Sequence, residues 1–220
     1  MTTFALIHGA GDVGWYWHLV EAELRSRGHD TVAPDLPIED DAAGLDRYAD
    51  VVIEAIGDRK DVVVVGQSFG GYVAPLVAER IGARLIVLVA GMVPRPEETA
   101  EEMFHNTGWQ PERLEDDSAI AVFYHDVPSD LAAEAMARER RQSDTPGVEP
   151  WPLAAWPGIP TRSIIGRIDR FFPVAWSRTV VHDRLGITPD EIDSGHCPAL
   201  SRPRELATLL EGYLAIDPKR

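Results

Sequence analysis

The segment Gly66-Gln67-Ser68-Phe69-Gly70 constrains the fold of this chain more than any other stretch. The β-branched run Val62–Val65 precedes it, and a helix-compatible segment over 72–81 follows it. A serine in a Gly-x-Ser-x-Gly pattern between a strand and a helix lies on a tight, strained turn, and the flanking glycines leave room for it. The pattern therefore predicts that Ser68 projects from a sheet at the amino end of a helix, where negative charge on a bound carbonyl oxygen is favoured.

Short apolar segments alternate with segments of helical periodicity along most of the chain. The expected strands are 4–8, 31–33, 62–65, 85–90, 161–165 and 191–193, and the expected helices are 15–27, 45–56, 72–81, 175–185 and 203–213. Such alternation is typical of a parallel sheet that is covered on both faces. Right-handed crossovers then bring the carboxyl ends of the strands to one edge. The sequence thus predicts an α/β fold with a mostly parallel sheet of about six strands.

The alternation is interrupted between Met92 and Gly158. This stretch is rich in proline, glutamate and large aromatic residues, and it contains two expected helices, over 96–106 and 129–141. Because the interruption leaves and rejoins the sheet at the same edge, we expect it to lie over that edge as a cap. The predicted organisation is a single domain with a core, 1–91 and 159–220, and a cap insertion, 92–158.

The charge and the cysteine content exclude several classes of function. A formal net charge of −15 over 220 residues argues against a nucleic-acid partner or an anionic membrane, because both need clustered Lys and Arg. The single cysteine, Cys197, allows no intrachain disulfide and no cysteine-based zinc site. The histidines show no ligand spacing, so we expect no metal and no cofactor.

The start of the chain and its apolar runs bear on where the protein is found. Phe4 to Ile7 already reads as a core strand rather than as part of a leader, and no run approaches the length needed to span a bilayer. We therefore expect a cytoplasmic protein that acts on a small molecule. The sequence leaves monomer and homodimer open.

A serine hydroxyl is a poor nucleophile without a neighbouring base. His196 is the expected base, because it follows the strand over 191–193 and so lies at the same sheet edge as Ser68. His8 also ends a strand, but the segment 9–11 that follows it reads as an oxyanion loop. The other histidines fall in the cap or in helices and helix ends: His18, His29, His105, His125 and His182.

The base needs a carboxylate to orient it, and Asp169 is the first candidate. It follows the strand over 161–165 and can approach His196 from a neighbouring loop. Asp193, three residues before His196, is the second choice, and Asp126 in the cap is the third. The chain order Ser68, Asp169, His196 is the order expected of a hydrolase with this type of serine turn.

The developing oxyanion needs two backbone N–H donors about 3 Å away. Phe69, the residue after the nucleophile, is expected to provide one, and Ala10 in the loop after the first strand the other, with Gly11 as the fallback donor. Gly9 and Gly11 give this loop room to approach the substrate. Residues expected to line the substrate pocket are Gly9, Gly11, Trp15, Trp109, Phe123, Tyr124 and Trp156.

Taken together, these segments resemble the α/β-hydrolase fold superfamily, in the branch of small esterases and plant-type hydroxynitrile lyases. The resemblance covers nearly the whole chain and is carried by His8-Gly9, the Trp15 and Trp17 pair, Gly66–Gly71, Gly166 with Asp169, and Gly195-His196. It implies a sheet that lacks the family's first antiparallel strands, because the chain starts at the strand before the oxyanion loop.

Two departures from the resemblance bear on the reaction. Plant hydroxynitrile lyases carry a lysine just after the catalytic histidine, whereas Cys197-Pro198-Ala199 follows His196 here. They also carry a threonine where this chain has Gly9. Both differences argue against cyanohydrin cleavage, and Ser68 argues against the epoxide hydrolases and haloalkane dehalogenases, which use an aspartate nucleophile.

The sequence therefore predicts a serine hydrolase that cleaves a small, apolar or aromatic ester or thioester through an acyl-enzyme. One alternative is a cofactor-free lyase or oxygenase in which the same His–Asp pair acts as a base without an acyl-enzyme. Another is a ligand-binding receptor on the hydrolase fold that turns over very slowly.

Overall fold

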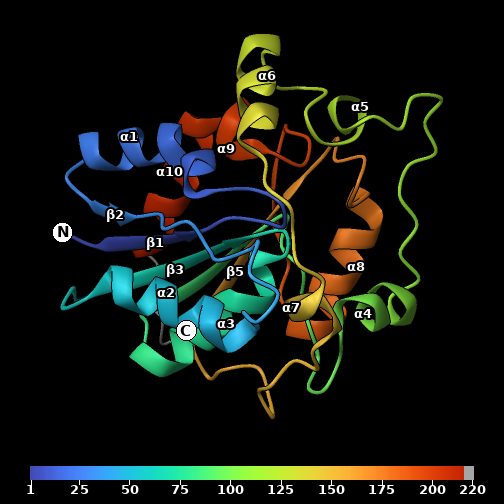
Figure 1. The fold of residues 1–220 in the computed structure, drawn as a ribbon. Coiled ribbons are helices and arrows are strands. Elements are labelled where there is room, and N and C mark those ends of the chain that lie inside the picture. The colour runs from blue at the N-terminus through green and yellow to red at the C-terminus, as the bar shows by residue number, and fades with distance from the viewer. Residues whose placement is uncertain (216–220) are drawn as a thin grey trace.

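The computed structural model describes residues 1–215 and confirms an α/β fold built on one six-stranded sheet. The strand order is β2-β1-β3-β4-β5-β6, and every neighbouring pair is parallel (Figure 1). The strands are β1 (Thr3–Ile7), β2 (Asp30–Val32), β3 (Val62–Gln67), β4 (Leu85–Val89), β5 (Thr161–Gly166) and β6 (Asp190–Ile192).

The valine run of β3 shows why the sheet is covered on both faces. Val62 and Val64 belong to one buried apolar cluster, and Val63 and Val65 belong to the other. Successive strand residues point to opposite faces, so a strand without polar residues requires helices on both sides. The first cluster packs under α2 (Leu45–Ile56), α3 (Gly70–Ile81) and α8 (Val174–Leu185), and the second under α1 (His18–Ser26), α9 (Pro198–Ser201) and α10 (Pro203–Gly212) (Figure 1). Two 3-10 turns, η1 (Gly14–Trp17) and η2 (Tyr213–Ala215), precede α1 and follow α10.

The segment between β4 and β5 contains four helices instead of the two expected from the sequence. They are α4 (Ala100–Asn106), α5 (Ala119–Phe123), α6 (Ser129–Arg138) and α7 (Thr145–Val148). The first begins at Ala100 rather than at 96, because Thr99 and Glu102 form a capping box at its amino end. Helix α6 ends at Arg138 rather than at 141. In Figure 1, α4 and α5 lie beyond the carboxyl ends of the strands, on the right-hand side.

The helices of the described residues differ from membrane-spanning helices in their length and composition. None of the helices within residues 1–215 combines the length and the apolar composition that crossing a bilayer requires.

Candidate active site

The turn at Ser68 has the strained backbone that the sequence pattern predicts. Ser68 lies between β3 and α3 with a φ of 49°, in the left-handed region that side chains rarely adopt. A Cβ added at Gly66 would lie 2.4 Å from the carbonyl oxygen of Gly70, and one added at Gly70 would lie 2.9 Å from that of Ile7. Both glycines are therefore needed for the turn to close against the sheet.

His196 and Asp169 form a buried pair. The Nδ1 atom of His196 lies 2.8 Å from Oδ2 of Asp169, and the residues are only 3% and 5% exposed. The other carboxylate oxygen, Oδ1, accepts hydrogen bonds from the backbone N–H groups of Phe171 at 2.9 Å and Phe172 at 2.8 Å. The loop after β5 thus holds the carboxylate in a fixed orientation toward the imidazole.

The other two candidate acids are engaged elsewhere. Asp193 forms an exposed ion pair with Arg167, at 2.7 Å. Asp126 accepts a hydrogen bond from the backbone N–H of Gly195 at 2.9 Å, so it holds the loop that carries the histidine and not the imidazole itself. The structure therefore brings Asp169 alone of the three into hydrogen-bond contact with His196.

Three aromatic rings surround the imidazole of His196. The ring centroids of Phe123, Phe171 and Phe172 lie 5.4, 5.3 and 5.0 Å from it. Phe123 was among the residues expected from the sequence, whereas Phe171 and Phe172 were not. The available signal was their position directly after the Asp169 turn, which carries them to the same strand end. The rings lower the local polarity and so strengthen electrostatic interactions at the histidine.

Gln67 connects the serine turn to the histidine loop. Its side-chain amide is buried and donates a hydrogen bond to the backbone carbonyl of His196, at 3.2 Å. Within residues 1–215 the Ser68 hydroxyl itself has no hydrogen-bond partner. Catalytic hydrogen bonds are often long before a substrate binds, so the lack of this bond does not exclude Ser68 as the nucleophile.

His8 fixes the loop that faces Ser68. Its Nδ1 lies 2.8 Å from the carbonyl oxygen of Gly9, and its Nε2 lies 3.0 Å from the backbone N–H of Leu36, which donates to it. These contacts are satisfied together by a neutral imidazole that donates from Nδ1. Burial lowers the pKa of His8 to about 4, so the ring keeps this form at neutral pH.

The segment 9–11, which the sequence predicts to be an oxyanion loop, lies directly against the serine turn. A Cβ added at Gly9 would lie 2.5 Å from Oε1 of Gln67 and 3.1 Å from the Cβ of Ser68. Among the described residues, the backbone N–H groups of Ala10 and Phe69 have no hydrogen-bond partner. The N–H of Gly11, the fallback donor, is instead engaged with Oε1 of Gln142, at 3.3 Å.

Three of the residues expected to line the pocket, Trp109, Tyr124 and Trp15, make different contacts. Trp109 donates from its indole to the carbonyl oxygen of Phe171 at 2.8 Å, so it backs the ring that touches His196. Tyr124 is buried and donates to Glu139 at 2.8 Å. Trp15 stacks on His18 on one side and lies 4.6 Å from the Arg138 guanidinium.

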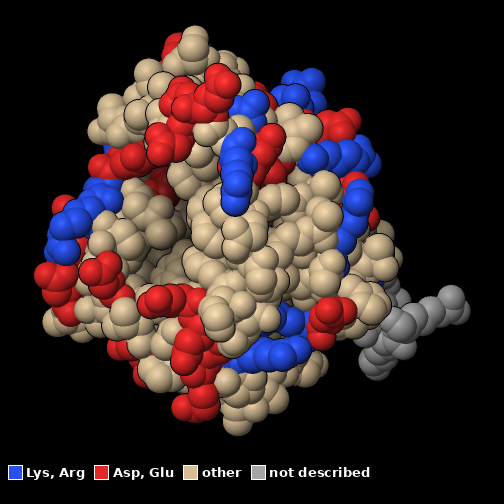
Figure 2. All heavy atoms as spheres, turned by 90° about the vertical axis from the view of Figure 1, so that its right-hand side faces the viewer, with Lys and Arg blue, Asp and Glu red and all other residues tan. Residues whose placement is uncertain are grey.

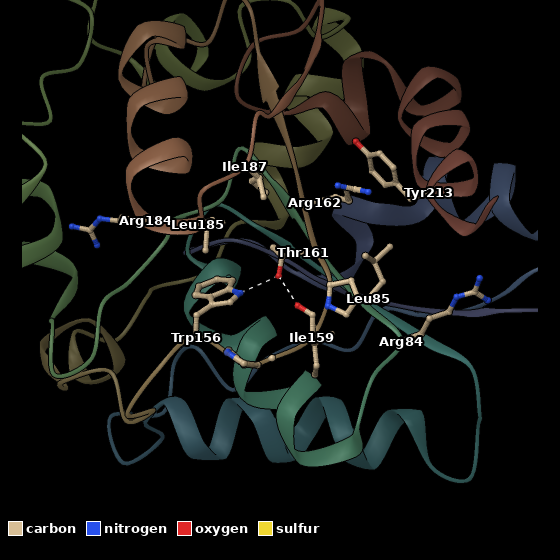
Figure 3. A pocket seen from close by; sticks show the side chains of 13 residues that line it. Arg84, Leu85, Trp156, Ile159, Thr161, Arg162, Arg184, Leu185, Ile187 and Tyr213 are labelled. Atoms are coloured by element: carbon tan, nitrogen blue, oxygen red, sulfur yellow. Dashed lines mark hydrogen bonds between the residues drawn. The ribbon is translucent and has the colours of Figure 1, made fainter. Parts of the chain in front are cut away.

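The expectation that Trp156 lines the same pocket was wrong. Trp156 donates to the hydroxyl of Thr161 at 3.0 Å, at the start of β5, because the chain returns under the sheet before this strand. It therefore lies at the amino ends of the strands, in a separate cavity of about 510 Å³ (Figure 3). No serine, cysteine or histidine of the described chain lines that cavity, and its Arg84 and Arg184 already pair with acidic residues.

The face of the molecule beyond the carboxyl ends of the strands is hollowed. Figure 2 shows a floor of uncharged atoms there, with both acidic and basic side chains around it. The elements that carry Ser68, Asp169 and His196 all end toward this face (Figure 1). An uncharged floor of this kind fits the apolar part of a ligand.

Comparisons with known proteins agree with this architecture. "Probable esterase PIR7A" of Oryza sativa subsp. indica is 25% identical over 252 residues, covering 94% of each chain. Norfluorocurarine synthase 1 of Strychnos sp is 31% identical over 103 residues, but this match spans only 41% of this chain and 39% of that protein. The crystal structure of polyneuridine aldehyde esterase superposes with a TM-score of 0.82 at 21% identity, covering 97% of this chain and 99% of the other.

A family model also matches most of the sequence. The model of the alpha/beta hydrolase family matches residues 4–209, which include the serine turn, both loops of the histidine pair and the segment between β4 and β5. This chain belongs to the alpha/beta hydrolase family.

Proposed function

We propose that the protein is a serine hydrolase that cleaves a small, apolar or aromatic ester or thioester through an acyl-enzyme. The buried His196–Asp169 pair, joined through Gln67 to the turn of Ser68, carries this proposal. A base with an orienting carboxylate next to a strained serine is the arrangement that nucleophilic acyl transfer needs.

In the proposed reaction the Ser68 oxygen attacks the substrate carbonyl carbon while Nε2 of His196 takes the hydroxyl proton. Asp169 keeps the proton on Nδ1 and stabilises the imidazolium that forms. The free N–H groups of Ala10 and Phe69 hold the oxyanion of the tetrahedral intermediate. The proton on Nε2 then passes to the leaving alcohol or thiol, which leaves the acyl group on Ser68. Water, deprotonated by His196, attacks this acyl-enzyme, and the proton returns to the Ser68 oxygen as the acid is released.

The substrate class follows from what surrounds the histidine. The imidazole of His196 is surrounded by the apolar rings of Phe123, Phe171 and Phe172. Burial raises the pKa of the neighbouring Cys197 thiol well above its usual range, so this thiol adds no charge to the site. The residues directly after His196 are Cys197-Pro198-Ala199, with no lysine among them to bind a cyanide leaving group. Two of the similar proteins are named as esterases, which also favours ester cleavage.

The test is a series of p-nitrophenyl esters of increasing acyl length, measured with the wild type and Ser68→Ala. We expect Ser68→Ala to lose at least about a thousandfold in kcat/KM. Ser163→Ala is the matched control: Ser163 is a buried serine on β5 whose hydroxyl has no partner in the described chain, and its removal should leave activity unchanged.

A fluorophosphonate probe distinguishes the alternatives. An acyl-enzyme mechanism requires that the probe labels Ser68, shown by a mass increase that Ser68→Ala lacks. Turnover that persists in Ser68→Ala contradicts the proposal and favours a lyase that uses His196 and Asp169 alone. Tight binding of apolar esters by the wild type without turnover favours a receptor.

A further inference from the structure

Asp12 is a carboxyl group beside the candidate site that the proposed reaction does not use. It lies two residues after Ala10, the proposed oxyanion donor. Its Oδ1 accepts a hydrogen bond from the backbone N–H of Val13, at 2.9 Å. Its Oδ2 has no hydrogen-bond partner in the described chain. This oxygen is not fully buried. Asp12 is thus partly buried, and one of its carboxylate oxygens is available to a ligand.

The loop that carries Asp12 lies between the serine turn and the cap segment: a Cβ added at Gly9 would lie 3.1 Å from the Cβ of Ser68, and the backbone N–H of Arg140 donates to the carbonyl oxygen of Gly11 at 2.8 Å. His196 is near enough to favour the ionised carboxyl, and Glu139 is near enough to oppose it. The charge of Asp12 is also felt by Tyr16 on η1, by Tyr124 in the segment between β4 and β5, and by Cys197 next to the histidine. Asp12 thus belongs to a group of ionisable residues contributed by the oxyanion loop, the cap segment and the histidine loop.

No cation of the described chain pairs with this carboxyl. Two basic residues of the cap segment are engaged with other acids: Arg138 pairs with Glu134 at 2.7 Å, and Arg140 pairs with Asp35 at 3.1 Å. Burial is the largest cause that raises the pKa of Asp12, to about 7, and the Glu139 carboxylate adds to it. An ionised carboxyl that is desolvated and unpaired is costly, and a bound cation relieves that cost.

We propose that Asp12 sets the charge preference of the site, selecting esters or thioesters that carry a positive charge near the scissile carbonyl over neutral esters of the same shape. This inference rests on the proposed serine hydrolase function and adds a substrate class to it. The aromatic rings around His196 fit the apolar part of such a substrate, and the faces of such rings attract quaternary ammonium groups. Asp12 supplies the full negative charge that the rings lack.

The test compares two thioesters of nearly equal shape: acetylthiocholine, which is cationic, and 3,3-dimethylbutyl thioacetate, its neutral carbon analogue. The ratio of their kcat/KM values cancels the titration of His196, because both substrates need it. We expect the wild type to prefer the cation by at least about tenfold at pH 8, the size of one charge-assisted contact of about 1.5 kcal/mol. The preference should shrink at pH 5.5, where Asp12 is protonated.

Asp12→Asn keeps the hydrogen bond to Val13 and removes only the charge. It should abolish the preference while changing kcat/KM for the neutral thioester by no more than about threefold. Asp58→Asn, an exposed acid far along the chain, is the matched control for net charge and should keep the preference. Glu139→Gln removes the opposing charge, so the preference should persist to lower pH than in the wild type.

The outcomes separate the two proposals. A wild type without a preference, or Asp12→Asn with an unchanged ratio, overturns the role of Asp12 while leaving a Ser68-dependent hydrolase intact. An equal loss for both thioesters in Asp12→Asn also overturns it, because that result indicates an effect through His196 alone. Turnover that survives Ser68→Ala removes the proposed function on which the inference rests.

Discussion

The Gln67 side-chain amide donates a hydrogen bond to the backbone carbonyl of His196, at 3.2 Å. The two residues are far apart in sequence, yet one directly precedes the candidate nucleophile and the other is the candidate base. The bond therefore couples the serine turn to the loop after β6, and Gly9 packs on the same amide from the other side. A single buried side chain positions three parts of the site.

Replacing Gln67 with methionine tests this coupling. Gln67→Met keeps the length of the side chain but leaves the His196 carbonyl without its donor. A lost buried hydrogen bond costs on the order of 1–2 kcal/mol, so we expect kcat to fall by about five- to thirtyfold with little change in KM. Steady-state kinetics on a neutral p-nitrophenyl ester measure this. A change confined to KM would show that Gln67 contacts substrate instead.

Replacing Asp169 with asparagine tests the orienting carboxylate. In Asp169→Asn the new side chain would keep an oxygen for the N–H groups of Phe171 and Phe172 but no longer stabilise the imidazolium, so kcat should fall by about 10³–10⁴. Asp193→Asn is the matched control, because Asp193 was the second candidate acid and pairs only with Arg167 at the surface. It should retain activity within about twofold. Similar losses in both variants would contradict the assignment of Asp169.

Local patterns in the sequence predicted the parts of the site that depend on strand ends. The turn at Ser68 follows from glycine spacing, and the sheet order brings Asp169 and His196 to its edge. The aromatic lining was harder, because the position of Trp156 depends on the path by which the chain returns to β5. The short helices α5, α7 and α9 carry too few residues for a periodic signal, and isolated helices of that length are unstable without tertiary packing. The raised pKa of Asp12 depends on burial and on Glu139 in the segment between β4 and β5, and no local sequence pattern indicates either.

Gly9 and Gly11, in the loop proposed to hold the oxyanion, should respond differently to replacement by alanine. A Cβ at position 9 would collide with Gln67 and crowd Ser68, whereas one at position 11 meets only the carbonyl oxygen of Arg140, at 3.6 Å. Gly11 has a φ of 75°, so Gly11→Ala should cost about 1 kcal/mol of folding stability through backbone strain. Gly9→Ala should instead reduce kcat by at least about a hundredfold, because displacing the loop misplaces the Ala10 donor.

Chemical denaturation and ester kinetics of the Gly9→Ala and Gly11→Ala proteins check these two predictions. The Gly11→Ala protein should be less stable but active within about fivefold. If Gly9→Ala is fully active, the loop does not contribute the oxyanion donor, and Ala10 has no part in the reaction.

The pH dependence of stability contains two opposing contributions, from His8 and Asp12. The folded pKa of His8, about 4, lies below its unfolded value near 6.5, so its contribution is complete above pH 6.5 and is lost as the pH falls toward 4. The folded pKa of Asp12, about 7, lies above its unfolded value, so its contribution is complete at low pH and is lost as the pH rises toward 7.

Between pH 6.5 and 5 these contributions have opposite slopes. Asp12→Asn removes one of them, so this variant should lose about 2 kcal/mol of unfolding free energy over the interval, and the wild type should lose clearly less. Urea unfolding at pH 6.5, 5.75 and 5 measures both. Parallel curves for the two proteins would show that Asp12 ionises in the folded state as it does in the unfolded chain.

The ion pair between Glu98 and Arg184 should contribute more to stability than the exposed pairs. It joins the segment after β4 to α8, and the two side chains are 5% and 4% exposed. Glu98 also accepts hydrogen bonds from the backbone N–H of Arg95 and from Asn106. Glu98→Gln leaves the Arg184 charge buried without its partner, so it should cost about 3–5 kcal/mol. Glu54→Gln, which breaks an exposed pair with Arg47, should cost less than about 1 kcal/mol.

The double variant Glu98→Gln with Arg184→Met distinguishes a lost attraction from an unpaired charge. Removing both charges should restore part of the stability that Glu98→Gln loses, because no buried charge is then left without a partner. Urea unfolding of the two single variants and the double variant gives the coupling energy. If Glu98→Gln costs no more than Glu54→Gln, Arg184 reaches solvent once its partner is gone, and the pair does not hold this segment to α8.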